Sequence, residues 1–171
     1  EIGAASGIVS IIFADWAKKN NISFKSVCIE PSFSNIDFLH ETVVKHNYDI
    51  RIIPCAVNKN EKWTSFELEP TGSKGLLGDA VTNKEYQTYK LSMTIKEIFS
   101  VSFKPNIIYI DALLNESLIL EQLLESDLIS IKILVEFDFG VPDIISKKCE
   151  DLNLVIEKID KVHYLIFRRN D

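Results

Sequence analysis

The sequence predicts an α/β fold with a mostly parallel sheet and an antiparallel edge towards the C-terminus. Three observations support this fold class. The chain opens with a glycine-containing turn that leads directly into a helix. Helical and buried-strand patterns then alternate, as they do in βαβ units. Several of the predicted strands end in an acidic residue.

In the first third of the chain, residues 8–20 and 32–46 have apolar side chains at helical spacing. Lys18 and Lys19 lie near the end of the first helix, where the helix dipole favours cations. The apolar segments 24–30 and 50–57 are predicted to be buried strands. Pro31 cannot continue a central strand, so Glu30 is expected at the C-terminal tip of the first of them.

The pattern changes at residues 63–93, which we expect to form an irregular excursion or hairpin over the ligand edge of the sheet. Thr94 is then predicted to cap a short helix that ends near residue 100. Strands are expected at 106–111 and 131–137, and helices at 115–128 and 143–151. Segments 155–159 and 162–167 would form an antiparallel pair around the turn at 160–161, which gives the sheet a mixed edge.

Length and composition are those of an ordinary globular protein. The 171 residues are 46% hydrophobic and 26% charged, which suits one domain covering residues 1–171. A net charge of -6 without a basic block argues against a broad nucleic-acid surface. The apolar runs are shorter than the ~20 residues that a membrane span needs. Oligomeric state stays open.

The cysteines and histidines do not form a predicted metal or catalytic site. Cys28, Cys55 and Cys149 are odd in number and widely spaced, so we expect reduced thiols, a cytoplasmic location and no metal site. His40, His46 and His163 are scattered along the sequence, and we interpret all three as structural or surface residues.

The opening heptapeptide EIGAASG has the form acid-x-Gly-x-x-x-Gly. Such a turn lets backbone N–H groups approach a nucleotide or cofactor, although it is also compatible with a simple helix-entry turn. Because only Glu1 and Ile2 precede the turn, most of the leading strand is expected to be missing. In open α/β sheets ligands bind beyond the carboxyl ends of strands, where the sequence predicts four acids: Glu1, Glu30, Asp111 and Glu136.

The acids favour one nucleoside cofactor over others. Glu30 stands where an acid can accept the ribose hydroxyls of an adenosine. A dinucleotide site needs G-x-G-x-x-G, whereas here Ala5 replaces the second glycine. Glu1 would repel a pyrophosphate but attract the cationic methionine end of S-adenosylmethionine. The sequence therefore favours a methyl donor over NAD or a nucleotide sugar.

Motifs along nearly the whole chain resemble, in order, those of the FkbM-type S-adenosylmethionine-dependent methyltransferases. EIGAASG resembles the family's Asp-Val-Gly-Ala-Asn-x-Gly opening, and CIEPSFSNIDFL its Glu-Pro-x-x-x-Asn-x-x-x-Leu segment. IPCAVNKNEKW is similar to its Ala-Val-Ser turn, LSMTIKEIF to its Val-x-Thr-Leu-Asp segment, and ILVEFDF to its last core strand. IIYIDALLNESLIL resembles the Ile-Asp-x-Glu-Gly-x-Glu signature.

The resemblance implies a Rossmann-like class I methyltransferase sandwich that uses S-adenosylmethionine to methylate a hydroxyl of a sugar, glycolipid or secondary metabolite. Asp111 and Glu116 match the outer acids of the signature, near the point of methyl transfer, and are the implied catalytic residues. Glu1, Gly3 and Gly7 would line the methionine part, Glu30 the ribose, and the turn at Ala56 and Val57 the adenine. The implied cofactor-binding residues are Glu1, Gly3, Ala4, Gly7, Glu30, Pro31, Ala56, Val57 and Asp111.

Two departures from the family pattern leave an alternative open. Leu113 and Leu114 stand where the signature has Glu-Gly, and Ala5 stands where the opening has Asn. Loss of a carboxylate beside the reacting centre could remove a general base, which typically contributes 10²–10⁴-fold to the rate. The alternative is a degenerate, non-catalytic methyltransferase-like module for binding or assembly. A nucleotide-sugar or NAD-binding module is a third possibility.

Overall fold

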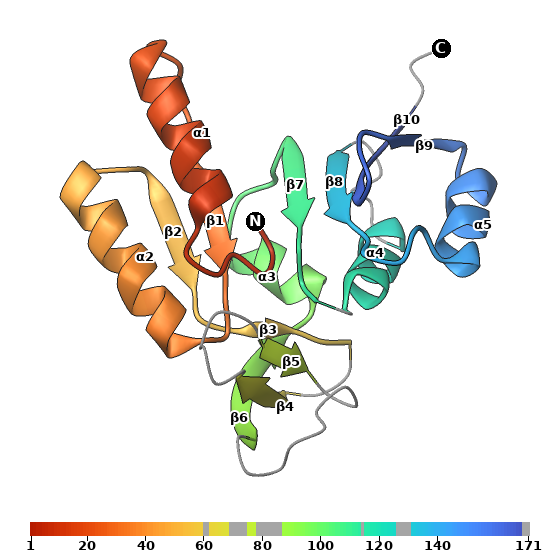
Figure 1. The fold of residues 1–171 in the computed structure, drawn as a ribbon, viewed down its shortest axis with the longest axis horizontal. Coiled ribbons are helices and arrows are strands. Elements are labelled where there is room, and N and C mark those ends of the chain that lie inside the picture. Colours follow the sequence, from red (N-terminus) through yellow and green to blue (C-terminus); the bar gives the residue numbers. More distant parts are fainter. Residues whose placement is uncertain (60–61, 69–74, 78–86, 114, 126–130, 169–171) are drawn as a thin grey trace. The chain divides into compact units, whose positions relative to one another are not determined.

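The computed structural model describes residues 1–59, 62–68, 75–77, 87–113, 115–125 and 131–168 (Figure 1). The chain divides into two compact units, each of which is described by itself. The first unit comprises Glu1–Ala56 and Glu61–Ser92, and the second comprises Val57–Asn60 and Met93–Asp171. Both units contain helices and strands, so the predicted α/β class is confirmed at this coarse level.

The first unit begins with a βαβ arrangement. The N-terminal amino group of Glu1 donates to Val27 O (2.8 Å), Ile29 N–H donates to Glu1 O (2.9 Å), and Gly3 N–H donates to Ile29 O (3.0 Å). The opening residues therefore run parallel to β1 (Ser26–Ile29), which itself pairs in parallel with β2 (Ile50–Ile53). Helices α1 (Ile8–Lys19) and α2 (Phe33–His46) connect these segments (Figure 1).

The core of this βαβ arrangement is small and closely packed. Leu39 of α2 and Cys28 of β1 are fully buried at its centre. They are joined by Ala4 of the opening turn, Ala14 of α1 and Ile50 of β2. Helix α2 buries Leu39 of its apolar stripe, whereas the buried face of α1 consists of the small residues Ser10, Ala14 and Ala17. The large apolar side chains of Ile8, Ile12 and Trp16, which helical spacing suggests for the inward face of α1, are exposed.

A second sheet follows in the chain. Its strand order is β3-β6-β4-β5, with β3 at Ala56–Val57, β4 at Trp63–Leu68, β5 at Gly75–Leu77 and β6 at Gln87–Met93. Strand β4 is antiparallel to both β5 and β6. The single strand expected at 50–57 is therefore wrong. Pro54 cannot donate to a strand ladder, so β2 ends at Ile53 and the chain pairs again only at Ala56. Gly72 and Gly78 of the expected excursion lie outside the described residues.

The second unit contains a mixed sheet with the order β7-β8-β10-β9. Strands β7 (Ile107–Ile110) and β8 (Lys132–Glu136) are parallel, whereas β10 (His163–Arg168) is antiparallel to both β8 and β9 (Leu154–Lys158). The predicted antiparallel pair near the C-terminus is confirmed. Its second strand, β10, lies inside the sheet and its first strand, β9, lies at the edge.

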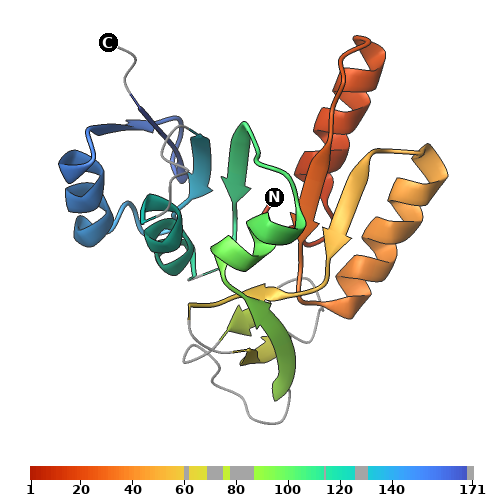
Figure 2. The same cartoon turned by 180° about the vertical axis from the view of Figure 1, so that it is seen from behind.

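The described part of the second unit also contains the helices α3 (Ile95–Val101), α4 (Glu116–Leu124) and α5 (Asp143–Asp151). Thr94 caps α3 as predicted, in a reciprocal capping box with Glu97. Helix α5 packs against α4 and β9, which Figure 2 shows from behind. The core of the second unit is formed by fully buried side chains from its helices and its mixed sheet, among them Ile98, Ile110, Leu120, Val135, Ile145 and Ile166.

Two expectations from composition can be compared with the structure. Among the residues that it describes, every helix falls short of the length and apolar character that crossing a bilayer demands. Cys28, Cys55 and Cys149 are buried and none of the three forms a disulfide bond, which confirms them as thiols within the fold.

Gly7 is required by packing as well as by its backbone conformation, and this requirement can be tested. It has φ of 70°, and a Cβ at this position would overlap Leu39 Cδ1. Gly7→Ala is therefore expected to lower the free energy of unfolding by about 2–4 kcal/mol, measured by urea denaturation. The matched control is Gly140→Ala: φ is 84° there too, but the nearest atom is Tyr164 Oη at 3.9 Å. This control should lose only about 1–2 kcal/mol. Equal losses in the two variants would contradict the packing argument.

Candidate functional site

The opening turn has an unusual backbone conformation. Gly3, Ala5 and Gly7 all have positive φ, at 77°, 46° and 70° respectively. Glycine adopts this region freely, but alanine does so at a cost of about 1–2 kcal/mol. Strain of this kind persists only where surrounding contacts hold it in place. In this turn, the contact is a hydrogen bond of 2.8 Å from Ala5 N–H to Glu30 Oε2.

Glu30 follows β1 directly, as predicted, and is almost fully buried at 5% exposure. Its Oε1 accepts hydrogen bonds from Ser32 N–H (2.8 Å) and from Asn35 Nδ2 (3.3 Å). Burial raises the pKa of Glu30, although these hydrogen bonds partly oppose the rise. A carboxylate has about four acceptor positions, so the three protein donors leave roughly one for a ligand hydroxyl.

The side chain of Glu1 lies at the N-terminus of α1. Its Oε2 accepts a hydrogen bond from Ser10 N–H (3.0 Å) in the first turn of the helix. The Cys28 thiol donates to the same oxygen at 3.6 Å, and burial raises the pKa of Cys28 to about 11. A helix N-terminus is where a phosphate would bind. In this chain a carboxylate of the protein already occupies that position.

The other predicted cofactor residues are located as follows. Ala4 is buried in the core of the first unit, and Gly7 is the N-cap of α1, where an added Cβ would overlap Leu39. Gly3 and Pro31 are half-buried, and they flank the Ala5–Glu30 contact in sequence. Ala56 and Val57 are buried in β3. The structure thus brings the opening turn together with Glu30, and it places Ala56 and Val57 on a separate strand.

Both implied catalytic residues lie in the second unit. Asp111 directly follows β7 and is exposed. Glu116 is the first residue of α4, and its Oε1 accepts a hydrogen bond from Ala112 N–H at 3.2 Å. Burial raises the pKa of Glu116, and the charges of Asp111 and Asp138 add to this rise. These acids therefore lie close enough to influence one another at the carboxyl ends of β7 and β8.

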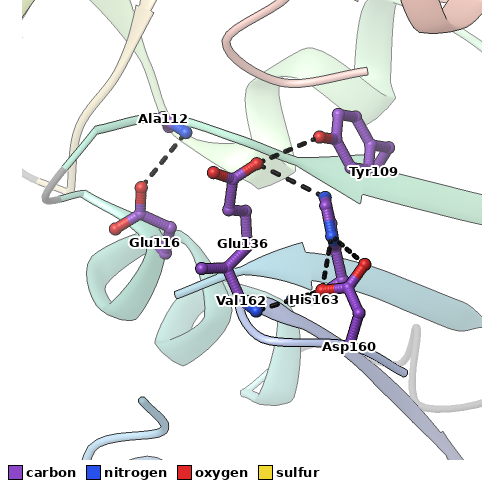
Figure 3. Close-up of polar contacts among 7 residues, drawn as sticks. All are labelled: Tyr109, Ala112, Glu116, Glu136, Asp160, Val162 and His163. Atoms are coloured by element: carbon purple, nitrogen blue, oxygen red, sulfur yellow. Dashed lines mark hydrogen bonds and ion pairs between the residues drawn. The ribbon is translucent and has the colours of Figure 1, made fainter. Parts of the chain in front are cut away.

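Sequence reasoning missed a histidine at the same end of this sheet (Figure 3). His163 Nδ1 lies 3.0 Å from Asp160 Oδ1 and 2.9 Å from Oδ2. On its other side, His163 Nε2 lies 3.4 Å from Glu136 Oε2, to which the Tyr109 hydroxyl also donates at 3.5 Å. The rings of Tyr109 and His163 are stacked with centroids 6.4 Å apart. The interpretation of His163 as a scattered structural or surface residue did not include these acidic partners.

The turn between β9 and β10 explains why the histidine is held in this way. Asp160 Oδ1 accepts hydrogen bonds from the backbone N–H groups of Val162 (3.0 Å) and His163 (2.9 Å). These two bonds, together with the one from the histidine ring, lower the pKa of Asp160 to about 2. An aspartate that bonds to N–H groups two and three residues later is a known turn pattern, so the spacing Asp-x-x-His was the available signal. The second acidic partner of His163, Glu136, comes from the neighbouring strand β8, where the antiparallel register places it directly opposite His163.

The two groups of residues differ in the chemistry that they can perform. The group in the first unit offers carboxylates and a tight turn, which suit binding of a cationic ligand that carries hydroxyls. The group in the second unit offers a histidine between two carboxylates, an arrangement that can accept and stabilise a proton. Within the part of the chain that the structure describes, no cluster of three or more acidic, histidine or cysteine side chains could hold a metal ion.

The strain at Ala5 leads to a stability prediction. Ala5→Asn should raise the free energy of unfolding by on the order of 1 kcal/mol, because asparagine tolerates the left-handed region that alanine avoids. The measurement is urea denaturation at neutral pH. Ala4→Asn is the contrasting variant: Ala4 is buried in the core, so this change should destabilise the protein. A loss of stability in Ala5→Asn would contradict the assignment of strain to this residue.

The lowered pKa of Asp160 leads to a prediction about acid stability. A carboxyl group whose pKa falls on folding stabilises the protein above its unfolded pKa, and this contribution disappears as the pH falls towards the folded value. The window for Asp160 therefore runs from its ordinary value of 3.8 down to about 2. Asp160→Asn should have a lower Tm than the wild type at pH 5–7, and the difference should shrink towards zero near pH 2. A difference independent of pH would contradict the assigned charge interaction.

No known family model and no curated protein matches this sequence. The fold is similar to that of a solved structure, the crystal structure of methyltransferase FkbM from Methylobacillus flagellatus KT. The TM-score is 0.58 at 14% sequence identity, and the similarity covers 98% of this chain. It covers 42% of the other chain, so this chain spans less than half the length of that methyltransferase. At this identity the similarity establishes a relationship of fold.

Proposed function

We propose that this chain is the core of an S-adenosylmethionine-dependent O-methyltransferase with a Rossmann-like class I sandwich fold. Its acceptor would be a hydroxyl of a sugar, glycolipid or secondary metabolite. The proposal treats residues 1–171 as one methyltransferase-like domain. The fold relationship to a methyltransferase and the ordered motifs of the sequence both support it.

The observation that carries the proposal is the position of Glu1 at the N-terminus of α1. Its carboxylate accepts the Ser10 N–H there, where a dinucleotide fold would bind pyrophosphate. Glu30 lies close enough for the charge of Glu1 to influence it. Two neighbouring carboxylates repel a phosphate and attract a sulfonium or ammonium group. This donor set therefore fits S-adenosylmethionine better than NAD or a nucleotide sugar.

Each residue would then have a distinct part in binding. When bound, the cofactor supplies an activated methyl group on a sulfonium. Glu1, Gly3, Ala4 and Gly7 would form the turn around its methionine part, with Glu1 attracting the positive charge. Glu30 would accept a ribose hydroxyl next to Pro31, while Ala56 and Val57 would border the adenine.

On the acceptor side, Asp111 and Glu116 would orient the hydroxyl that receives the methyl group. Alignment of the nucleophile with the methyl group is the main requirement of this reaction. The raised pKa of Glu116 favours its neutral form, in which the carboxyl group could donate a hydrogen bond as well as accept one.

One observation favours a second candidate, a degenerate module that binds without methylating. Leu113 stands where the family signature places a carboxylate, and it is half-buried immediately before α4. Its neighbour Leu114 lies outside the described residues. This candidate predicts that the chain binds the cofactor without turnover. It also predicts that the double variant Leu113→Glu, Leu114→Gly lowers no measured activity, because the wild type has none to lose.

Binding of S-adenosylhomocysteine tests the cofactor assignment directly. Calorimetry with the folded wild-type chain should give a measurable Kd, and Glu30→Gln should weaken binding by about 10- to 100-fold. The expected loss is that of a hydrogen bond to a charged group, about 1.5–3 kcal/mol. The matched control is Glu41→Gln on the exposed face of α2, which should bind like the wild type.

Two results would count against the assignment. The first is an absence of heat at millimolar ligand with folded wild-type protein. The second is tight binding of NAD under the same conditions, which would favour a dinucleotide module. The circular dichroism spectrum of each variant confirms that a loss of binding is not a loss of fold, since Glu30 also holds the opening turn.

A further inference from the structure

His163 and its partners form a cluster that the proposed cofactor site does not use. Three segments of the second unit supply it: Tyr109 comes from β7, Glu136 from the end of β8, and Asp160 with His163 from the β9–β10 turn and the start of β10. The side chain of His163 is 30% exposed, so a ligand can reach the ring. Figure 3 shows the ring between the carboxylates of Asp160 and Glu136.

The two nitrogens of the ring are in different environments. Nδ1 lies within 3.0 Å of both Asp160 oxygens, and the negative carboxylate requires a proton on that nitrogen. In neutral His163, the lone pair is therefore on Nε2. The distance from Nε2 to Glu136 Oε2 is 3.4 Å, longer than a typical hydrogen bond. The bond between Nδ1 and Asp160 thus orients the ring, while Nε2 itself has no short hydrogen bond to Glu136.

This is the arrangement of a general base. A carboxylate that holds one ring nitrogen fixes the tautomer and aims the other nitrogen at a substrate proton. Glu136 lies where it would attract the imidazolium formed by proton uptake. The charged and titratable groups facing His163 are Asp160 on its own turn, Glu136 on β8 and Tyr109 on β7.

The position of the cluster agrees with that role. Glu136 and Asp111 follow the carboxyl ends of adjacent parallel strands, where open α/β sheets bind ligands. His163 is opposite Glu136 in the antiparallel register of β10, so it lies at the same end of the sheet. At position 113, where the family signature has a glutamate, this chain has a leucine, which cannot take up a proton.

We propose that His163 is the catalytic base for the acceptor hydroxyl, that Asp160 is its positioning residue, and that Glu136 stabilises the protonated ring. The proposal rests on the methyl transfer proposed above. The acceptor O–H bond would break and its proton would pass to Nε2. A bound methyl donor would supply the methyl carbon to the oxygen electron pair and keep the electron pair of its own carbon–sulfur bond. The added proton would make His163 an imidazolium.

The availability of Nε2 can be tested without knowing the acceptor. Diethylpyrocarbonate acylates unprotonated imidazole nitrogen, and peptide mass spectrometry resolves the three histidines of the whole chain. At pH 8.5, well above the ordinary imidazole pKa of about 6.5, His163 should react at Nε2, and faster than His40 and His46 even though both of these are more exposed. Asp160→Asn should slow the reaction of His163 by about tenfold, because the ring loses its charged partner. The control Asp151→Asn, at an exposed acid of α5, should not.

Two results of this experiment would overturn the proposal. The first is an unreactive His163 in folded protein, which would show that Nε2 is locked in a structural contact. The second is equal reactivity in the wild type and Asp160→Asn, which would remove the positioning role. Binding of S-adenosylhomocysteine, measured on the same samples, separates the two hypotheses. Failure of acylation with intact binding overturns the base alone, whereas failure of binding with normal acylation overturns the methyl-donor assignment.

A kinetic measurement completes the test. The probe is a methyl glycoside, with S-adenosylmethionine as donor and release of S-adenosylhomocysteine as the readout. Where the wild type methylates this probe, His163→Gln should lower kcat by about 10²–10⁴-fold and leave the KM for the donor unchanged. A wild-type kcat in His163→Gln would overturn the proposal. His40→Gln is the matched control and should keep full activity.

Discussion

The buried carboxylate of Glu30 is the constraint on which the proposed cofactor end of the first unit depends. It accepts hydrogen bonds from Ala5 N–H in the opening turn, 25 residues earlier in the chain, and from Ser32 N–H at the start of α2, two residues later. One side chain therefore holds both segments in place. Burial of a charged group is unfavourable unless hydrogen bonds compensate, and the raised pKa of Glu30 shows that they do so only in part. The same carboxylate would have to serve a ligand, so binding and local stability are coupled through one side chain.

The second unit holds its acids in a different way. Asp160, Glu136 and His163 are partly exposed, and exposed ion pairs contribute little to stability because water screens them. Their arrangement nevertheless has a definite geometry, because Asp160 is fixed by two backbone N–H groups and Glu136 by strand register. The backbone hydrogen bonds to Asp160 stabilise its turn, whereas the exposed ion pairs of His163 add little stability. Chemistry at the site therefore explains the position of the histidine better than folding does.

Local patterns were sufficient to predict most helices and strands. The helical stripes, the Thr94 cap and the strands ending at Glu30 and Asp111 depend on neighbouring residues, so sequence periodicity reports them. The break at Pro54 was underestimated because an apolar run suggests one strand even where a proline must interrupt the ladder. The pairing of His163 with Glu136 could not be found from spacing, since strand register brings together residues 27 apart. The contact between Asp160 and His163 was local and could have been found.

Leu113 bears on how a site of the proposed kind could carry out methyl transfer. Methyl transfer needs a nucleophile held in line and a place for its proton, and neither requirement specifies which segment supplies the base. Any side chain at the carboxyl end of the sheet meets the second requirement if a partner fixes its proton-accepting atom. His163 comes from β10, far along the chain from the signature, and it has such a partner in Asp160. A missing motif carboxylate is therefore weak evidence for inactivity when register and a neighbouring turn place another base at the same edge.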